Sequence, residues 1–88
     1  SMERNNMKEI IIDATKMQTA EKIHEFLLKE LEFPDWYGKN LDALFDCLTE
    51  SPEELHLILK ESKTLPRGFL KVFYAAAKEN PKILIFKQ

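Results

Sequence analysis

Asp42 and Asp46 lie four positions apart, and this pair of carboxylates is the clearest candidate in the sequence for a binding or catalytic site. Residues four apart share one face of a helix, so a helical segment here would place the two carboxylates side by side. Such a pair can accept charge-assisted hydrogen bonds from arginine, hold a metal ion, or act as an acid and a base. The plain structural alternative is that Asp42 complements the dipole at a helix start and that Asp46 is simply solvated.

The catalytic and metal-binding interpretations lack the partners that they require. Cys47, the one cysteine, has no histidine near it in the sequence that would complete a nucleophile–base set. His24 borders an apolar helical face and His56 alternates with leucines, so we expect both to be structural. No histidine or cysteine ligands are spaced to complete a metal site around the aspartates, and two glycines cannot build a phosphate-cradling loop. We therefore predict no enzyme, no metal and no cofactor.

Acidic side chains are concentrated in the middle of the chain. Residues 32–54 contain seven acidic residues and one basic residue, whereas the remainder contains eight acidic and twelve basic residues. An acidic block repels nucleic-acid phosphates and attracts a cationic partner, although such runs are often merely solvated faces. We therefore expect no nucleic acid among the partners and favour a basic protein.

A loop and a short helix bring aromatic residues next to the aspartates. Pro34 and Gly38 break the helical period, which predicts a loop that carries Trp36 and Tyr37. Asn40 is a favourable cap for a helix over 41–49, whose leucines recur at helical spacing. Exposed tryptophan and tyrosine are enriched at binding sites, yet such residues also often belong to the core.

The pattern of apolar runs and breaking residues predicts an α/β fold with the element order β-α-α-β-α-β. The predicted strands are 8–13, 55–59 and 83–86, and the predicted helices are 20–31, 41–49 and a third that begins at Thr64 or Leu65 and stops at Asn80. Strands that are joined by helices are expected to pair in parallel. The prediction is a three-stranded parallel sheet packed with about three helices, with the middle strand buried on both faces. The order of the strands in space stays open.

The size and composition limit the class of protein. A length of 88 residues predicts one domain over residues 1–88, and we expect residues 1–6 to be disordered or to derive from cloning. No apolar run approaches the about 20 residues that a membrane-spanning helix needs. A lone cysteine cannot form an intrachain disulfide, which favours a reducing, cytoplasmic location. We expect no membrane contact and a monomer when the partner is absent.

The stretch PDWYGKNLDALFDCLT, residues 34–49, resembles the barstar family of intracellular ribonuclease inhibitors. Its YGxNLDALxDCLT core is long and of low degeneracy, and a looser similarity runs from about Lys8 to Lys87. The resemblance implies a barstar-like fold and an immunity or antitoxin protein. In that family a short acidic helix and the loop before it block the active site of a basic, barnase-like ribonuclease. The alternative is an acidic interaction module for a basic partner or toxin that is not a nuclease.

The resemblance also implies which residues meet the partner. Trp36 stands where barstar has an interface tyrosine, while Asp42 and Asp46 match two interface aspartates. Three positions depart from the barstar pattern, because Phe45 replaces a tryptophan, Glu50 replaces a glycine and Ala75 replaces an interface glutamate. The residues predicted to bind the partner are Trp36, Tyr37, Gly38, Asn40, Asp42, Phe45, Asp46 and Thr49.

Overall fold

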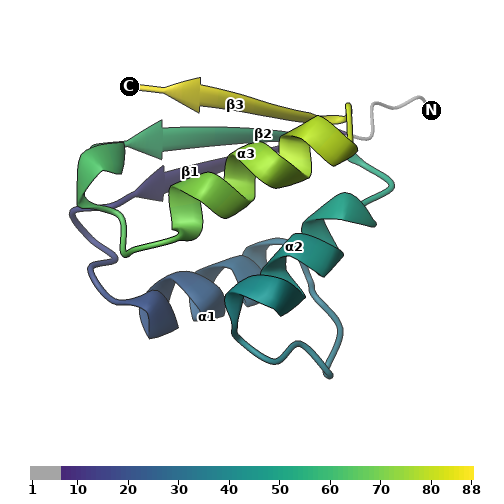
Figure 1. Cartoon of the computed structure of the whole chain (residues 1–88), viewed down its shortest axis with the longest axis horizontal. Helices are drawn as coiled ribbons and strands as arrows, with labels where there is room; N and C mark the ends of the chain where they lie inside the picture. Colours follow the sequence, from purple (N-terminus) through teal and green to yellow (C-terminus); the bar gives the residue numbers. More distant parts are fainter. Residues whose placement is uncertain (1–6) are drawn as a thin grey trace.

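The computed structural model describes residues 7–88, so the expectation for residues 1–6 lies outside the described part (Figure 1). The elements in chain order are β1 (Met7–Asp13), α1 (Ala20–Glu30), α2 (Leu41–Thr49), β2 (Glu54–Lys60), a short 3₁₀ helix (Ser62–Thr64), α3 (Phe69–Glu79) and β3 (Ile83–Lys87). This order confirms the predicted β-α-α-β-α-β arrangement. None of the helices in the described part has both the length and the apolar character needed to cross a bilayer.

The three strands form one parallel sheet in the order β1-β2-β3. The parallel pairing confirms the prediction, and the spatial order, which the sequence left open, equals the order along the chain. In the register of this sheet, Ile11 of β1 lies beside Ile58 of β2, which lies beside Phe86 of β3. The centre of the sheet is therefore β2, which is paired on both sides.

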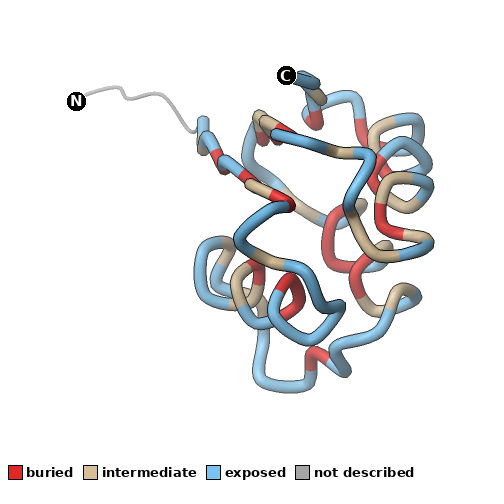
Figure 2. The backbone as a smooth tube through the Cα atoms, turned by 90° about the vertical axis from the view of Figure 1, so that its left-hand side faces the viewer, coloured by how far each residue is buried: buried red, intermediate tan, exposed pale blue. Residues whose placement is uncertain are grey.

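The helices lie on one side of the sheet, so the strands are buried on one face only (Figure 2). Leu57 of β2 is fully buried, whereas its neighbours His56 and Ile58 are half-buried. On the uncovered face, Ile11 keeps 50% and Phe86 45% of its surface exposed. The prediction that the middle strand is buried on both faces is therefore wrong, because no element in the described part covers the second face.

Two of the three helices begin where the sequence predicts, and the third begins later. Thr19 caps α1 by accepting a hydrogen bond from the Lys22 amide, and α2 has the predicted bounds. The predicted start of α3 at Thr64 or Leu65 is wrong, because the helix begins at Phe69. Gly68 adopts φ 92°, a left-handed conformation that a right-handed helix cannot continue through.

A continuous core joins the sheet to all three helices. Ile10 and Leu57 lie in the sheet and contact a cluster that includes Leu27 of α1, Leu48 of α2 and Phe73 of α3. All of these side chains are 2% exposed or less. Burial of such side chains is the main favourable contribution to folding. The core therefore holds α2 firmly, although this helix has only nine residues.

Candidate functional site

The N-terminus of α2 is ordered by local hydrogen bonds. The Asn40 side-chain Oδ1 accepts a hydrogen bond from the Ala43 amide at 2.8 Å, which satisfies one free amide of the first turn. Lys39 adopts a left-handed backbone conformation with φ 54°. A Cβ atom on Gly38 would lie 3.0 Å from the side-chain Nδ2 atom of Asn40. Asn40 and Gly38 therefore shape the entry to the helix.

Both ends of α2 are attached to α3 or to the chain just after it. At the N-terminal end, a Cβ on Gly68 would lie only 2.5 Å from the Leu41 Cδ1 atom, so the two elements approach closely. At the C-terminal end, the side-chain amide of the buried Asn80 donates through Nδ2 to the backbone carbonyls of Leu48 at 3.1 Å and Ser51 at 3.2 Å. From the sequence, Asn80 is expected only to stop the preceding helix. Its position before a proline predicted the stop but carried no sign of these distant contacts.

The two aromatic residues of the loop point in opposite directions. Trp36 is 64% exposed, the highest exposure among the large hydrophobic residues in the described part. Tyr37 is 6% exposed, and its hydroxyl is hydrogen-bonded to the buried His24 Nδ1 atom of α1. Its ring also lies 4.8 Å from that of Phe33. The Tyr37 side chain therefore belongs to the core of the free chain, and its contact with a partner stays a prediction.

Burial also shifts the pKa values of this internal pair. Desolvation raises the pKa of the Tyr37 phenol, so the hydroxyl stays protonated. Desolvation, with a smaller contribution from the Lys39 charge, lowers the pKa of His24. A neutral imidazole can accept the proton of the phenol at Nδ1. The prediction that His24 is structural is confirmed, although the sequence did not identify Tyr37 as its partner.

The outer surface of α2 carries the two aspartates. Asp42 and Asp46 are both outside the buried core, and a spacing of four residues places them about 40° apart around the helix axis. Phe45 and Thr49 lie beside them and are half-buried. The Thr49 hydroxyl donates to the backbone carbonyl of Asp46 at 3.0 Å. The Asp46 carboxylate takes no part in this hydrogen bond. Two carboxylates and an apolar ring thus form one surface.

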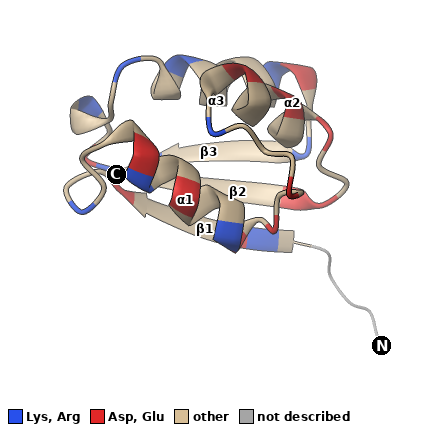
Figure 3. Cartoon of the chain, turned by 90° about the horizontal axis from the view of Figure 1, so that it is seen from below, with Lys and Arg blue, Asp and Glu red and all other residues tan. Residues whose placement is uncertain are grey.

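No basic residue of the described part neutralises these aspartates. Lys39 is the one basic residue of the acidic segment, and its ammonium lies 3.4 Å from the Glu25 carboxylate of α1. Neither Asp42 nor Asp46 takes part in an ion pair within residues 7–88. Figure 3 shows the acidic positions on α2 and on the chain that precedes it. The negative potential of this surface is therefore available to a partner.

The chemistry available to Cys47 is limited by its surroundings. The thiol is buried, and this desolvation raises its pKa, which the charges of Glu50 and Asp46 raise further. A nucleophilic cysteine needs the thiolate form, which these surroundings disfavour. Within residues 7–88, no three potential ligands gather in a way that would hold a metal ion. The carboxylates of Asp42 and Asp46 are instead suited to pairing with cationic side chains of another protein.

Four of the predicted binding residues lie on the outer side of α2, namely Asp42, Phe45, Asp46 and Thr49. Trp36 lies in the loop before this helix and lines a groove together with Cys47 of α2. The remaining three predicted residues position the loop and the helix, with Gly38 and Asn40 at the helix entry and Tyr37 beneath the loop.

Comparison with known proteins agrees with this arrangement. The family model described as "Barstar (barnase inhibitor)" matches residues 7–81. A curated protein of Bacillus subtilis (strain 168), named "Putative ribonuclease inhibitor YrdF", is 54% identical over 43 residues. The matched part is 49% of this chain and 47% of that protein, so the match spans about half the length of the curated relative.

Proposed function

Because the chain belongs to the barstar family, we propose that it inhibits a basic ribonuclease, whose active site it blocks with Trp36 and the carboxylates of α2. The family model carries the name of a barnase inhibitor, and the name of the Bacillus subtilis relative refers to ribonuclease inhibition. In a cell that makes the nuclease, such an inhibitor serves as an immunity or antitoxin protein. It would act in the cytoplasm, where the RNA must be protected.

One observation carries this proposal. Asp42 and Asp46 lie side by side on the outer surface of a helix that the core holds rigidly, and no basic residue of the described part neutralises them. An active site that cleaves RNA must bind phosphate, so it presents arginine and lysine side chains. Carboxylates in the phosphate positions accept charge-assisted hydrogen bonds from these side chains. Asp46, near the middle of the surface, is the residue that we expect to be buried most deeply.

The aromatic residue beside the carboxylates has a different task. Trp36 provides a large apolar surface at low cost in conformational entropy, and its indole N–H can still donate a hydrogen bond. By covering the contact it excludes water from the ion pairs and so strengthens them. The charge complementarity would also accelerate encounter, so the association rate should fall as the salt concentration rises.

The proposal is tested by replacing Asp46 and measuring inhibition. The nucleases are barnase and any basic ribonuclease that the immobilised chain retains from an extract of its native host. We expect Asp46→Ala to weaken binding by about 2–5 kcal/mol, because cations of the nuclease are left buried and unpaired. The barnase–barstar pair itself is the best-known case of such coupling between close charges, so this range is a family precedent.

The matched control is Glu9→Ala, which removes one exposed carboxylate from the uncovered face of the sheet. This variant has the same change in net charge as Asp46→Ala and should inhibit like the original chain. Equal inhibition by the two variants would show that the Asp46 carboxylate does not pair with the nuclease. Retention of a basic protein without ribonuclease activity would instead support the acidic interaction module.

A further inference from the structure

A groove of about 370 Å³ lies next to the aspartate surface, on the side of α2 that carries Cys47. Its walls come from the chain after α1, the Trp36 loop, the C-terminal half of α2 and the segment that leads into β2. Leu31, Phe33 and Pro34 form an apolar wall, and Cys47 and Leu55 also line the groove. A side chain of a partner that reaches Trp36 could enter this groove.

Trp36 is an exposed part of the groove lining. The side chain is 64% exposed, while its neighbour Tyr37 is fixed in the core by His24 and Phe33. The backbone that carries Trp36 is therefore held in place before any partner binds. An accessible indole ring on a backbone held in this way is the best aromatic surface for an incoming cation.

Three carboxylates surround the groove, and they come from three separate segments. Glu32 follows α1, Glu50 follows α2, and Glu53 precedes β2. None of the three is ion-paired within the part of the chain that the structure describes, and no lysine, arginine or histidine lines the groove. The Lys82 ammonium donates to the Pro52 carbonyl at 2.9 Å and is not part of the lining. The groove thus combines apolar walls with three carboxylates that form no ion pair within residues 7–88.

We propose that this groove receives an arginine side chain of the partner, with its guanidinium stacked on Trp36 and paired with Glu50 and Glu53. The inference rests on the proposed function, because it assigns a further contact to the same basic partner. The aliphatic part of the arginine would lie against the apolar wall formed by Phe33 and its neighbours. The occupant is assigned by charge complementarity between the groove and a cationic side chain that also has an apolar stem.

Arginine fits these features better than lysine. A guanidinium is planar, stacks on an indole ring and can donate to two carboxylates at once, whereas an ammonium is a compact and strongly hydrated charge. Glu50 stands where the barstar pattern has a glycine, so its carboxylate is an addition to that pattern. The groove is therefore expected to help this chain distinguish its own nuclease from others.

The inference can be tested without the nuclease, by titrating the whole chain with Nα-acetyl-arginine amide. We expect saturable shifts of the Trp36 indole and of the Glu50 and Glu53 signals in NMR spectra. Nα-acetyl-citrulline amide, the uncharged isostere, should produce no comparable shifts. The double variant Glu50→Gln with Glu53→Gln should lower the affinity for the arginine amide at least about five-fold, since it removes two ion pairs.

The Asp46→Asn variant separates this inference from the proposed function. It should bind the arginine amide like the original chain while it loses inhibition of the nuclease. If the arginine amide shifts the signals of Asp42 and Asp46 instead of the groove, or if citrulline binds equally well, the arginine site is excluded. The proposed function would survive that result, because its own test is the loss of inhibition in Asp46→Ala. If neither Asp46 variant loses inhibition while the groove binds arginine, the proposed role of the α2 aspartates is excluded and the arginine site in the groove is retained.

Discussion

The stretch from residue 36 to residue 49 has an inner side and an outer side, and the two differ in every property that matters for function. On the inner side, Tyr37 and Leu48 are buried, in contact with α1 and the central core. On the outer side, Trp36 is exposed and the two aspartates of α2 have no basic partner within residues 7–88. Exposure changes within one step of the chain, from 64% at Trp36 to 6% at Tyr37.

Folding and binding thus depend on separate side chains of one short segment. The inner residues gain their free energy from burial and from internal hydrogen bonds. The outer residues gain little in the free chain, because like charges four apart on a helix repel by a few tenths of a kcal/mol. Substitutions on the inner side should therefore reduce stability, and those on the outer side should reduce affinity.

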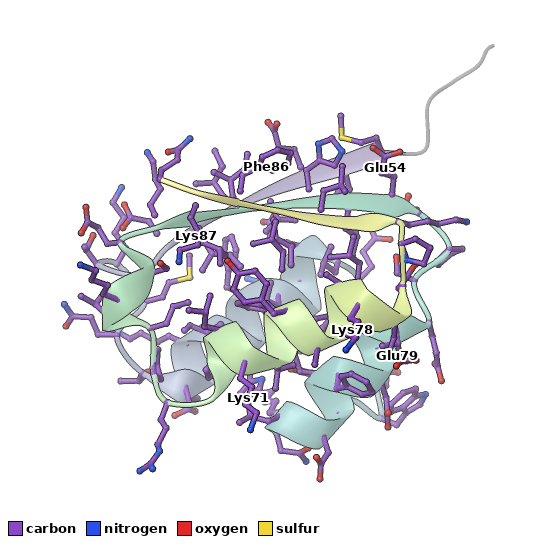
Figure 4. All side chains as sticks on the ribbon, turned by 45° about the horizontal axis from the view of Figure 1, so that its top comes forward. Glu54, Lys71, Lys78, Glu79, Phe86 and Lys87 are labelled. Carbon is purple, nitrogen blue, oxygen red and sulfur yellow. The ribbon has the colours of Figure 1, made fainter. Side chains whose placement is uncertain are left out.

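The uncovered face of the sheet shows that exposure alone does not make a comparable site. Figure 4 shows Phe86 on β3 pointing away from the helices, at the surface of the molecule. Ile11, Ile58 and Phe86 form an apolar row across the three strands. This row has no rigid loop and no concentrated charge, whereas the α2 surface has both.

The largest expected effect comes from Leu48, on the inner side of α2. Leu48→Ala should lower the free energy of unfolding by about 2–5 kcal/mol, because it creates a cavity in the core. Urea denaturation followed by circular dichroism measures this change. Asp46→Ala, two residues away on the outer side, should alter stability by less than about 0.5 kcal/mol. Similar losses of stability in both variants would contradict the division into two sides.

A smaller effect is expected at Tyr37. Tyr37→Phe should lower the free energy of unfolding by about 1–3 kcal/mol, because the buried His24 Nδ1 atom loses its partner. The measurement is again urea denaturation. Trp36→Ala is the matched control, since it removes a larger aromatic ring from the adjacent position and should leave stability nearly unchanged. Greater destabilisation by Trp36→Ala than by Tyr37→Phe would contradict the statement that the inner side of the segment stabilises the fold and the outer side does not.

The same internal pair predicts a dependence of stability on pH. The pKa of His24 is lowered from its ordinary value of 6.5, so below pH 6.5 the unfolded chain binds a proton that the folded chain does not. The contribution is fully present above pH 6.5, falls by at most about 1.4 kcal/mol per pH unit, and levels off below the folded pKa. Urea midpoints measured from pH 7.5 downward test this prediction.

A histidine substitution identifies the group that titrates. His24→Gln should remove this part of the pH dependence, because no imidazole then remains beneath the loop. His56→Gln, in the sheet, leaves the His24–Tyr37 pair in place and should retain it. If the pH dependence persists in His24→Gln and disappears in His56→Gln, the titrating group is His56 in the sheet, and the prediction for His24 is wrong.

The smallest effect is expected at Asn40, where the two sides of the segment meet. Asn40→Ala should reduce stability by about 1 kcal/mol, because the Ala43 amide loses its capping acceptor. Asn40→Ser keeps an acceptor at this position and should remain close to the original stability. Thermal denaturation measures both variants, and equal stability of the alanine and serine variants would show that the cap contributes nothing.

The features of α2 were predictable because they depend on nearby residues. Its bounds, 41–49, follow from the Asn40 cap and from apolar residues that recur at helical spacing. The position of Asp42 and Asp46 on the outer surface follows from the same spacing, which places them outside the apolar stripe. The start of α3 was mispredicted because Pro66 is compatible with a first helical turn, while Gly68 determines where the helix begins.

The element order, the bounds of α2 and the acidic character of its segment could be predicted from the residues alone, because these properties depend on composition and on interactions within a few residues. Three other features depend on how the chain folds: Tyr37 turns inward to His24, Asn80 holds the end of α2, and three separate glutamates line one groove. Each of these contacts joins residues distant in the chain, and their meeting depends on how the helices pack on the sheet.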